Sequence, residues 1–369
     1  MTLLKDLYSK SFYENLSNTL IEIYPEFNKP EFIKDIYSAG FEAKELKERM
    51  RHTTIVIHKY MPSSYKETVE LLFTLINKLS ESEPDSANDR LAYSFLPDYI
   101  EVYGIDDYDT SVKAMEFITK FVSCEFAVRP FILKYKEKMI DQMIKWSKHE
   151  DPHVRRLASE GSRPRLPWAI ALQFLKKDPS PIFPILENLK EDKHDFVRRS
   201  VANNINDISK DNPQIAIHIA KRWIGNSKDT DRLIKHACRT LLKQGNSDIL
   251  KLYGLDDLNI NVNNLTIKNK NIYINDNLSF SFEVENNKDQ DQILRIEYGL
   301  YYMKSNGLQS RKVFKISERT FKPFEKAVIN RKHPFKIITT RKFYTGEHKI
   351  SVIINGKELL IDLFYLLKD

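Results

Sequence analysis

The sequence predicts a mainly α-helical protein with an all-β C-terminal part: a HEAT-like helical-repeat solenoid followed by an immunoglobulin-like sandwich. Three observations predict this order. Up to about residue 255, apolar residues recur at three- and four-residue spacing, as they do on amphipathic helices. A short motif repeats there at about the ~40-residue period of HEAT-like helix pairs. After Leu255, apolar and polar residues alternate with a period of two, which is typical of half-buried strands.

Helical spacing is clearest in four segments: Ser111–Phe121, Ile132–Trp146, Trp168–Lys176 and Ile215–Trp223. The pairs Asp151-Pro152 and Asn212-Pro213 fit helix starts, because Asp or Asn caps the helix and proline lacks only an N–H that is not needed there. We expect a helix to begin at Pro152 and to end at Gly161, with this glycine as a left-handed cap.

The repeated motif is Val154-Arg155-Arg156, which returns 43 residues later as Val197-Arg198-Arg199. A weaker copy, Ile234-Lys235-His236, follows 37 residues after the second. Such repeats stack into a solenoid with an extended concave surface. Since Val-Arg pairs also tie neighbouring repeats together, at most one arginine of each pair need face a ligand.

The C-terminal part reads as a series of strands. Residues Leu278–Val284 alternate strictly, and Ile350–Ile354 and Glu358–Phe364 flank Asn355-Gly356, a type I′ hairpin signal. Further strands are expected at Asn259–Ile267, Ile293–Met303, Val313–Ile316 and Phe335–Phe343. About seven strands in ~110 residues fit an immunoglobulin-like sandwich, although this part has no Cys and no Trp. We therefore expect a repeat domain over 1–255 and a sandwich over 256–369.

Positive charge is concentrated in the second of these domains. The chain has a net charge of +7, and residues 256–369 hold 19 Lys and Arg against 14 Asp and Glu. Eleven of these basic residues lie between Arg311 and Lys342, where the acidic residues are Glu318 and Glu325. Such a stripe indicates a polyanion such as DNA, or equally a solubilising face. The candidate DNA contacts are Arg311, Lys312, Arg331 and Lys332.

Several classes of protein are disfavoured. No apolar run approaches the ~20 residues of a membrane span, and charge interrupts any signal-peptide core. Two cysteines make no disulfide framework, so we expect a soluble, cytoplasmic protein of bacterial type. Neither a Walker loop, a dinucleotide fingerprint, HExxH nor Gly-x-Ser-x-Gly is present. His149 and His153 straddle Asp151-Pro152, so we expect no metal site and no cofactor.

The segment His153–Trp168 places a charged residue where local helix preferences disfavour it, followed by arginines and an aromatic residue. Glu160 falls in the last helical turn, where the helix dipole disfavours a carboxylate. Arg163 and Arg165 follow on either side of a proline, and a second proline precedes Trp168. Functional sites break local rules in this way. The alternative is an ordinary loop between repeats in which Glu160 pairs with Arg163 or Arg156.

Three segments carry a resemblance to a known family: HVRRLASEGSRPRLPWA (153–169), VRRSVANNINDISKDNP (197–213) and SCEFAVRPF (123–131). They resemble the AlkC branch of the AlkC/AlkD DNA alkylation-repair glycosylases over about residues 100–215, and the order of repeats and sandwich resembles one AlkC subgroup. The resemblance implies a monofunctional glycosylase, acting as a monomer on double-stranded DNA. It would hydrolyse the N-glycosidic bond of cationic N3-methylated bases, 3-methyladenine and 3-methylcytosine, without flipping the base fully out of the stack.

The resemblance also assigns residues. By position, Glu125, Glu160, Asp207 and Trp168 match the family's catalytic carboxylates and aromatic residue, and Arg156 and Arg163 match its DNA-contacting arginines. Arg165 and Arg199 are further candidates for DNA contact. The residue types suit the chemistry, because an N3-methylated base is already positively charged before it leaves and needs no general acid. Carboxylates then stabilise the oxocarbenium-like sugar, and an indole face attracts the cationic base.

Two other functions stay open. A non-catalytic DNA-binding scaffold would bind DNA without releasing a base. A HEAT-type protein-interaction platform would show no salt-sensitive DNA binding at all.

Overall fold

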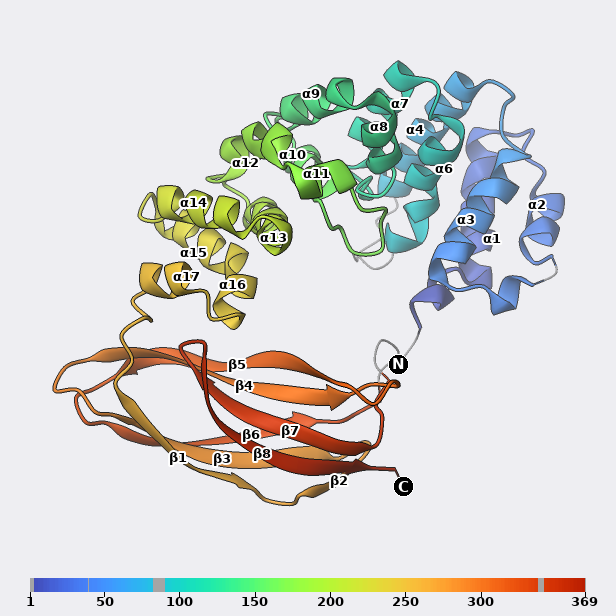
Figure 1. Ribbon diagram of the computed structural model, residues 1–369. Coiled ribbons are helices and arrows are strands. Elements are labelled where there is room, and N and C mark those ends of the chain that lie inside the picture. The colour runs from blue at the N-terminus through green and yellow to red at the C-terminus, as the bar shows by residue number, and fades with distance from the viewer. Residues whose placement is uncertain (1–2, 39, 82–89, 338–341, 369) are drawn as a thin grey trace. The chain divides into compact units, whose positions relative to one another are not determined.

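The computed structural model describes residues 3–38, 40–81, 90–337 and 342–368, and it shows a run of helices followed by a run of strands (Figure 1). The α-helices are α1 (Lys10–Ile23), α2 (Lys29–Ile36), α3 (Leu46–His58), α4 (Tyr65–Glu81), α6 (Phe95–Tyr103), α7 (Tyr108–Ile118), α8 (Val128–Tyr135), α9 (Glu137–Trp146), α10 (Pro152–Gly161), α11 (Gln173–Lys177), α12 (Phe183–Leu189), α13 (Asp195–Asp211), α14 (Pro213–Trp223), α15 (Lys228–Ala237), α16 (Arg239–Lys243) and α17 (Ser247–Leu252). The strands are β1 (Ile260–Ile267), β2 (Asn271–Tyr273), β3 (Asn277–Asn286), β4 (Gln292–Met303), β5 (Gln309–Phe321), β6 (Lys326–Pro334), β7 (Gly346–Ile354) and β8 (Lys357–Leu367).

The chain forms two compact units. One comprises Met1–Asn212 and Trp223–Ala237, and the other comprises Pro213–Arg222 and Cys238–Asp369. The change from helix to strand falls between α17 and β1, as the sequence predicts. Three helices before this change, α14, α16 and α17, nevertheless group with the strands. The boundary at residue 255 therefore describes secondary structure, and its use as a domain limit stays a prediction.

In the helical unit, α1 to α13 follow one another in chain order, from blue to yellow-green in Figure 1. Helix α10 packs on α9 and α13, and α13 packs on α15. Helix α10 starts at Pro152 as predicted, and the Asp151 side chain caps it by accepting a hydrogen bond of 2.7 Å from the His153 N–H. The repeated motif thus lies on two neighbouring, packed helices.

Two helix predictions are wrong in detail. Gly161 ends α10, but it is not left-handed; a Cβ there would lie 2.5 Å from Val128 Cγ1, so glycine is needed for the close approach of α8. The predicted helix Ile132–Trp146 is divided into α8 and α9 by Lys136, whose φ is 46°. Neither Gly nor Pro marks this break in the sequence.

The predicted helix Trp168–Lys176 is also wrong at its start. Helix α11 begins only at Gln173, and Trp168 has a φ of 65°. The backbone carbonyls of Trp168 and Ile170 accept hydrogen bonds from the side chains of Lys47 and Arg129. Tertiary contacts therefore take carbonyl groups that a helix would have used.

The strands form two sheets, one with the order β1-β3-β6 and the other with the order β2-β8-β7-β4-β5. Apolar side chains from both sheets fill the core, among them Phe282 of the first and Leu294, Ile350 and Phe364 of the second. Neighbouring strands pair antiparallel except β2 with β8. The predicted two-sheet sandwich is therefore the observed fold of this part.

The β7–β8 hairpin turns as predicted. Asn355 and Gly356 have φ values of 47° and 74°, which is the type I′ pattern. A Cβ on Gly356 would also lie 2.5 Å from Gly245 Cα, so this glycine serves both the turn and a close approach.

The strand expected at Phe335–Phe343 is wrong over the described residues, because the strand, β6, ends at Pro334; residues 338–341 lie outside the described residues. β6 is an edge strand, and its Lys and Arg side chains interrupt the alternation of polar and apolar residues that would predict a strand. The short strand β2 was not predicted.

Candidate functional site

Glu160 and Asp207 meet at a single guanidinium group. Arg163 Nη1 lies 2.6 Å from Glu160 Oε1, and Arg163 Nε lies 2.8 Å from Asp207 Oδ2. All three residues are buried, with exposed fractions of 6%, 1% and 7% for Glu160, Asp207 and Arg163. The other carboxylate oxygens accept from Ser200 Oγ at 2.6 Å and from Lys210 Nζ at 2.8 Å. Arg163 thus joins Glu160 in the last turn of α10 to Asp207 near the end of α13, and each carboxylate accepts one further hydrogen bond.

Burial alone would lower the pKa of Arg163, but the two carboxylates outweigh it and raise the pKa above its usual value. The guanidinium is therefore charged at every physiological pH. This pairing is also the one that the alternative interpretation of Glu160 expects.

Arg129 on α8 is close enough to Arg163, Asp207, Glu125 and Glu160 to interact electrostatically with each of them. Its Nε donates to the Ile170 carbonyl at 2.7 Å, and its Nη1 donates to the carbonyls of Gly161 and Arg163 at 2.9 and 2.8 Å. Burial, with a smaller effect of Arg163, lowers the pKa of Arg129 to about 10, while the nearby carboxylates oppose the shift. Arg129 therefore stays charged at neutral pH inside the protein.

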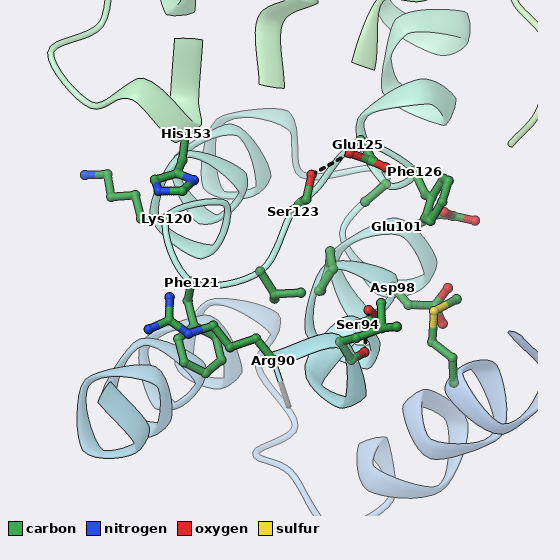
Figure 2. A pocket seen from close by; sticks show the side chains of 15 residues that line it. Arg90, Ser94, Asp98, Glu101, Lys120, Phe121, Ser123, Glu125, Phe126 and His153 are labelled. Carbon is green, nitrogen blue, oxygen red and sulfur yellow. Dashed lines mark hydrogen bonds between the residues drawn. The ribbon is translucent and has the colours of Figure 1, made fainter. Parts of the chain in front are cut away.

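Glu125 lies apart from the Arg163 cluster, in a cavity of 440 Å³ (Figure 2). Its Oε2 accepts from Ser123 Oγ and pairs with Arg156 Nη2, both at 2.9 Å. Arg156 is one helical turn before Glu160 on α10, so Glu125 is tied to the same helix. The side chain of Glu125 is 18% exposed, so this carboxylate is more open than Glu160 or Asp207.

The cavity at Glu125 has two chemically different sides. Figure 2 shows Asp98, Glu101 and Glu125 on one side, and Arg90 and Lys120 on the other. Burial raises the pKa of Glu101, opposed by its hydrogen bond from Arg51. The remaining lining residues are Met50, Leu91, Ser94, Pro97, Phe121, Val122, Ser123, Phe126, Ala127 and His153.

Trp168 stands at an adjoining cavity of 790 Å³, which shares Met50, Asp98, Glu101 and Phe126 with the first. Trp168 is 64% exposed, so its side chain contributes little to the hydrophobic core. Lys47 Nζ donates to the Trp168 carbonyl at 2.5 Å and lies 5.0 Å from the centre of the Phe126 ring. The indole is thus presented to solvent from a loop that is bonded to α3.

The other two predicted arginines of the helical unit are exposed. Arg165 Nε and Nη2 lie 2.6 and 2.5 Å from the two oxygens of Asp211. Arg199 has a side chain that is 71% exposed and pairs with Asp195 on its own helix. Both guanidinium groups are accessible to an anion.

The predicted basic residues of the sandwich lie on two consecutive edge strands. Arg311 and Lys312 are on β5, and Arg331 and Lys332 are on β6. Five basic residues of these strands and their turn form ion pairs: Arg311–Glu358, Lys315–Glu318, Arg319–Glu325, Lys322–Asp291 and Lys326–Glu285. Arg331 and Lys332 instead line a groove of 740 Å³ on the three-stranded sheet, together with Lys268, Ser279, Ser281, Thr266, Asn330 and Phe280.

The structure therefore groups Glu160, Asp207 and Arg163 directly, with Glu125 tied to α10 and Trp168 in the next cavity. Sequence reasoning missed Arg129, Asp98 and Glu101. A signal existed for two of them, because Arg129 and Asp98 stand inside the apolar runs Val128–Phe131 and Leu96–Ile100, where a charge has to be paired. Lys47 gave no signal of this kind.

Among the described residues, no cluster of His, Cys, Asp and Glu is arranged to hold a metal ion. None of the described helices is both long enough and apolar enough to cross a membrane.

Comparisons with known proteins point in one direction. Residues 64–241 match the family described as "DNA alkylation repair enzyme", and residues 261–368 match the "Uncharacterised protein YhaZ, C-terminal Ig-like domain" family. The uncharacterized protein YhaZ of Bacillus subtilis (strain 168) is 42% identical over 355 residues, which is 96% of each chain. The Pseudomonas fluorescens alkylpurine DNA glycosylase AlkC, solved bound to DNA containing an abasic site analog, is 33% identical, with a TM-score of 0.92 over 99% of this chain and 100% of that one.

Both relatives are matched over nearly their whole length, and the two family models match the helical part and the sandwich of this chain. The chain belongs to the DNA alkylation repair enzymes, in the AlkC-type group with a C-terminal immunoglobulin-like domain.

Proposed function

We propose that this protein is a monofunctional DNA glycosylase that excises cationic N3-methylated bases, 3-methyladenine and 3-methylcytosine, from duplex DNA. One observation carries the proposal: Glu160 and Asp207 share the buried guanidinium of Arg163, and Glu125 pairs with Arg156 on the same helix as Glu160. The exposed Trp168 stands at the cavity that adjoins that of Glu125. Acidic groups and an aromatic face are what a cationic base and a positively charged sugar require.

The reaction needs little proton chemistry on the base. The electrons of the bond between C1′ and the base nitrogen leave with the methylated base, which departs as a neutral molecule. The sugar then carries oxocarbenium character until water adds at C1′ and loses a proton. Carboxylates near C1′ lower the free energy of this transition state. A lesion base that is already cationic also explains why no separate general acid is required.

The carboxylates differ in what they can do. Glu160 and Asp207 are held by Arg163, Ser200 and Lys210, which fixes their positions but reduces their net field. Glu125 is bonded through Oε2 to Ser123 and Arg156 and faces a cavity, so it is the carboxylate that water reaches most easily. We assign direct stabilisation of the sugar to all three, with the largest single contribution from Glu125.

DNA would be held by exposed cations on both units. Arg156, Arg165 and Arg199 serve the helical unit, and the groove at Arg331 and Lys332 serves the sandwich, with Arg311 and Lys312 on β5 of the other sheet. Arg163, predicted as a DNA contact, is buried and bonded to Glu160 and Asp207, so it supports the carboxylates and is not an exposed cation. The DNA in the AlkC complex contains an abasic site analog, which resembles the state after a base has left. The base need not flip fully from the stack if the indole and the carboxylates reach it there.

The test is release of free methylated base in single turnover from alkylated duplex DNA. Glu125→Gln, Glu160→Gln and Asp207→Asn should each slow excision by about 10²-fold or more, the usual effect of removing one preorganised electrostatic group. DNA affinity should be unchanged or improved, because a negative charge that repels phosphate is removed. Glu150→Gln, an exposed carboxylate just before α10, is the matched control.

Normal excision by all three amide variants would end the assignment. DNA binding by the wild-type protein without any base release would favour the scaffold function, and no salt-sensitive binding would favour the interaction platform.

The sandwich is tested by charge rather than by truncation. Arg331→Gln with Lys332→Gln should weaken binding to damaged and undamaged duplexes alike and reduce the log–log salt slope by about 0.9 for each phosphate that is no longer neutralised. Lys304→Gln with Lys357→Gln removes two exposed lysines elsewhere on the sandwich and serves as the control. Equal slopes for the two double variants would mean that the groove is only a solvated face.

A further inference from the structure

The loop between α10 and α11 holds Trp168 in an unfavourable conformation. The residue has a φ of 65°, in the left-handed region that bulky side chains rarely adopt, and it is 64% exposed. Burial of the side chain therefore cannot be what keeps it there. A strained, exposed residue persists only when its surroundings fix the backbone.

The first such restraint is Arg129. One side chain bonds to the carbonyls of Gly161, Arg163 and Ile170, so it spans the loop from the end of α10 to a point just after Trp168. Arg129 is 0% exposed, and an arginine in that position has no solvent to replace these bonds if they break. The planar guanidinium thereby fixes the two ends of the loop relative to each other.

The second restraint is Lys47, which acts on Trp168 itself. Its ammonium group donates to the Trp168 carbonyl at 2.5 Å and rests over the Phe126 ring, 5.0 Å from the ring centre. Lys47 is on α3, before residue 64, where the match to the repair-enzyme family begins. It is exposed, so its removal should not disturb the core.

We propose that Lys47 and Arg129 are positioning residues that hold the 163–172 loop in the shape that presents the Trp168 indole to DNA. The inference rests on the proposed function for the role of Trp168, and it extends the working site to the N-terminal helices. A preorganised indole loses less conformational freedom when it meets the lesion, and a displacement of about 1 Å in a reacting geometry costs up to ~10²-fold in rate.

Trp168 offers a readout that needs no DNA. The other two tryptophans, Trp146 and Trp223, are each 1% exposed, so a collisional quencher such as acrylamide reports mainly on Trp168. The Trp168→Phe variant supplies the background of the two buried indoles. Quenching and fluorescence anisotropy then measure how firmly the loop is held.

The decisive variant is Lys47→Met, which keeps most of the side-chain length and removes the donor. We expect lower anisotropy and stronger quenching of Trp168, a loss of about tenfold in single-turnover excision, and unchanged DNA affinity and salt slope. Lys47→Arg retains a donor and should restore much of the wild-type anisotropy. Lys44→Met removes another lysine from the rim of the same cavity and should leave Trp168 fluorescence unchanged.

Two outcomes would overturn the proposal. Wild-type quenching and anisotropy in Lys47→Met would show that the lysine does not restrain the loop. Weaker DNA binding with a salt slope lower by about 0.9, and unaltered Trp168 fluorescence, would identify Lys47 as a phosphate contact instead.

Arg129 is tested with Arg129→Lys, which keeps the charge but cannot reach three carbonyls. Trp168 should become more easily quenched at temperatures where circular dichroism shows a folded protein, and unchanged quenching there would remove Arg129 from the proposal. If the wild-type protein released no base at all, the proposed function would fail, but these fluorescence measurements would still decide whether the loop is tethered.

Discussion

The two copies of the Val-Arg-Arg motif place their first arginines alike. On α10, Arg155 Nε lies 2.5 Å from Asp192, which precedes α13. On α13, Arg198 Nη2 lies 3.3 Å from Asp229, in the first turn of α15. Each first arginine therefore ties its helix to the beginning of a helix in the next repeat. These residues give the solenoid its regular stacking.

The second arginines differ. Arg156 reaches back to Glu125 and Ser123, and its side chain is 28% exposed. Arg199 points into solvent with a side chain that is 71% exposed and pairs only within its own helix among the described ion pairs. One sequence motif thus contains a structural position and a variable one. At the variable position, Arg156 pairs with Glu125 from before α8, whereas Arg199 pairs with Asp195 on its own helix.

Among the arginines of the two copies, substitution of Arg155 should change the free energy of unfolding most. Its side chain is 11% exposed, Asp192 is 4% exposed, and the guanidinium also bonds to the carbonyls of His149 and Glu150. Removing one partner of a buried ion pair costs about 3–5 kcal/mol. Arg155→Met should therefore lower the free energy of unfolding by about this amount in urea denaturation. Arg156→Met should change it by less than about 1 kcal/mol, and equal losses would contradict the division between the two positions.

Arg198 should behave like Arg155, but more weakly. Its side chain is 12% exposed, whereas its partners Asp195 and Asp229 are 57% and 50% exposed, so solvent screens both pairs. Its bond of 2.5 Å to the Asp192 carbonyl is the better protected contact. Arg198→Met should cost about 1–2 kcal/mol, most of it from this bond. A destabilisation as large as that of Arg155→Met would mean that the exposed carboxylates matter more than screening allows.

Acid should weaken the contact between α10 and the segment before α13, because it protonates Asp192, the partner of Arg155. Burial alone would raise the pKa of Asp192, but hydrogen bonds from Arg155 and the His194 N–H outweigh it and hold the pKa below its usual value. The unfolded chain then binds the proton more readily, so this stabilisation is present above about pH 4 and is lost as the pH falls through the lowered pKa. The difference in unfolding free energy between the wild type and Asp192→Asn should shrink on acidification. A difference that stays constant with pH would show that the carboxylate is not linked to stability.

Sequence periodicity predicted the fold because each of its signals is local. Asp151 and Pro152 set the start of α10 by themselves, and Asn355-Gly356 needs only its own backbone to turn. The loop at Trp168 was predicted as helix because its conformation is imposed by Lys47 and Arg129, which lie 121 and 41 residues away from their acceptors in the chain. Helical spacing carries no information about such distant donors.

The candidate site shows the same division. Glu160 and Arg163 are three residues apart, so their pairing is an explicit alternative on sequence grounds alone. The contribution of Asp207 to the same guanidinium spans 44 residues, and the resemblance to a family, not spacing, indicated this residue. The apolar residues around Arg129 indicate that its charge is buried, but an arginine that binds only backbone carbonyls has no side-chain partner that the sequence could reveal.

The smallest effect on stability should come from Arg199, so its contribution to DNA binding can be measured apart from any contribution to folding. Arg199→Ala removes a solvent-exposed ion pair, so the free energy of unfolding should change by less than about 0.5 kcal/mol. If the guanidinium contacts a phosphate, DNA affinity should fall equally for damaged and undamaged duplexes, and the salt slope should drop by about 0.9. Single-turnover excision at saturating protein should stay at the wild-type rate, since Arg199 belongs to neither the Arg163 cluster nor the Glu125 cavity. Arg232→Ala is a fair control, because that side chain is 81% exposed on α15 and pairs with Asp229 in a comparable way. An unchanged salt slope for Arg199→Ala would show that Arg199 does not contact a phosphate. Arg198 would then be structural, and any DNA contact by the repeated motif would be made by α10.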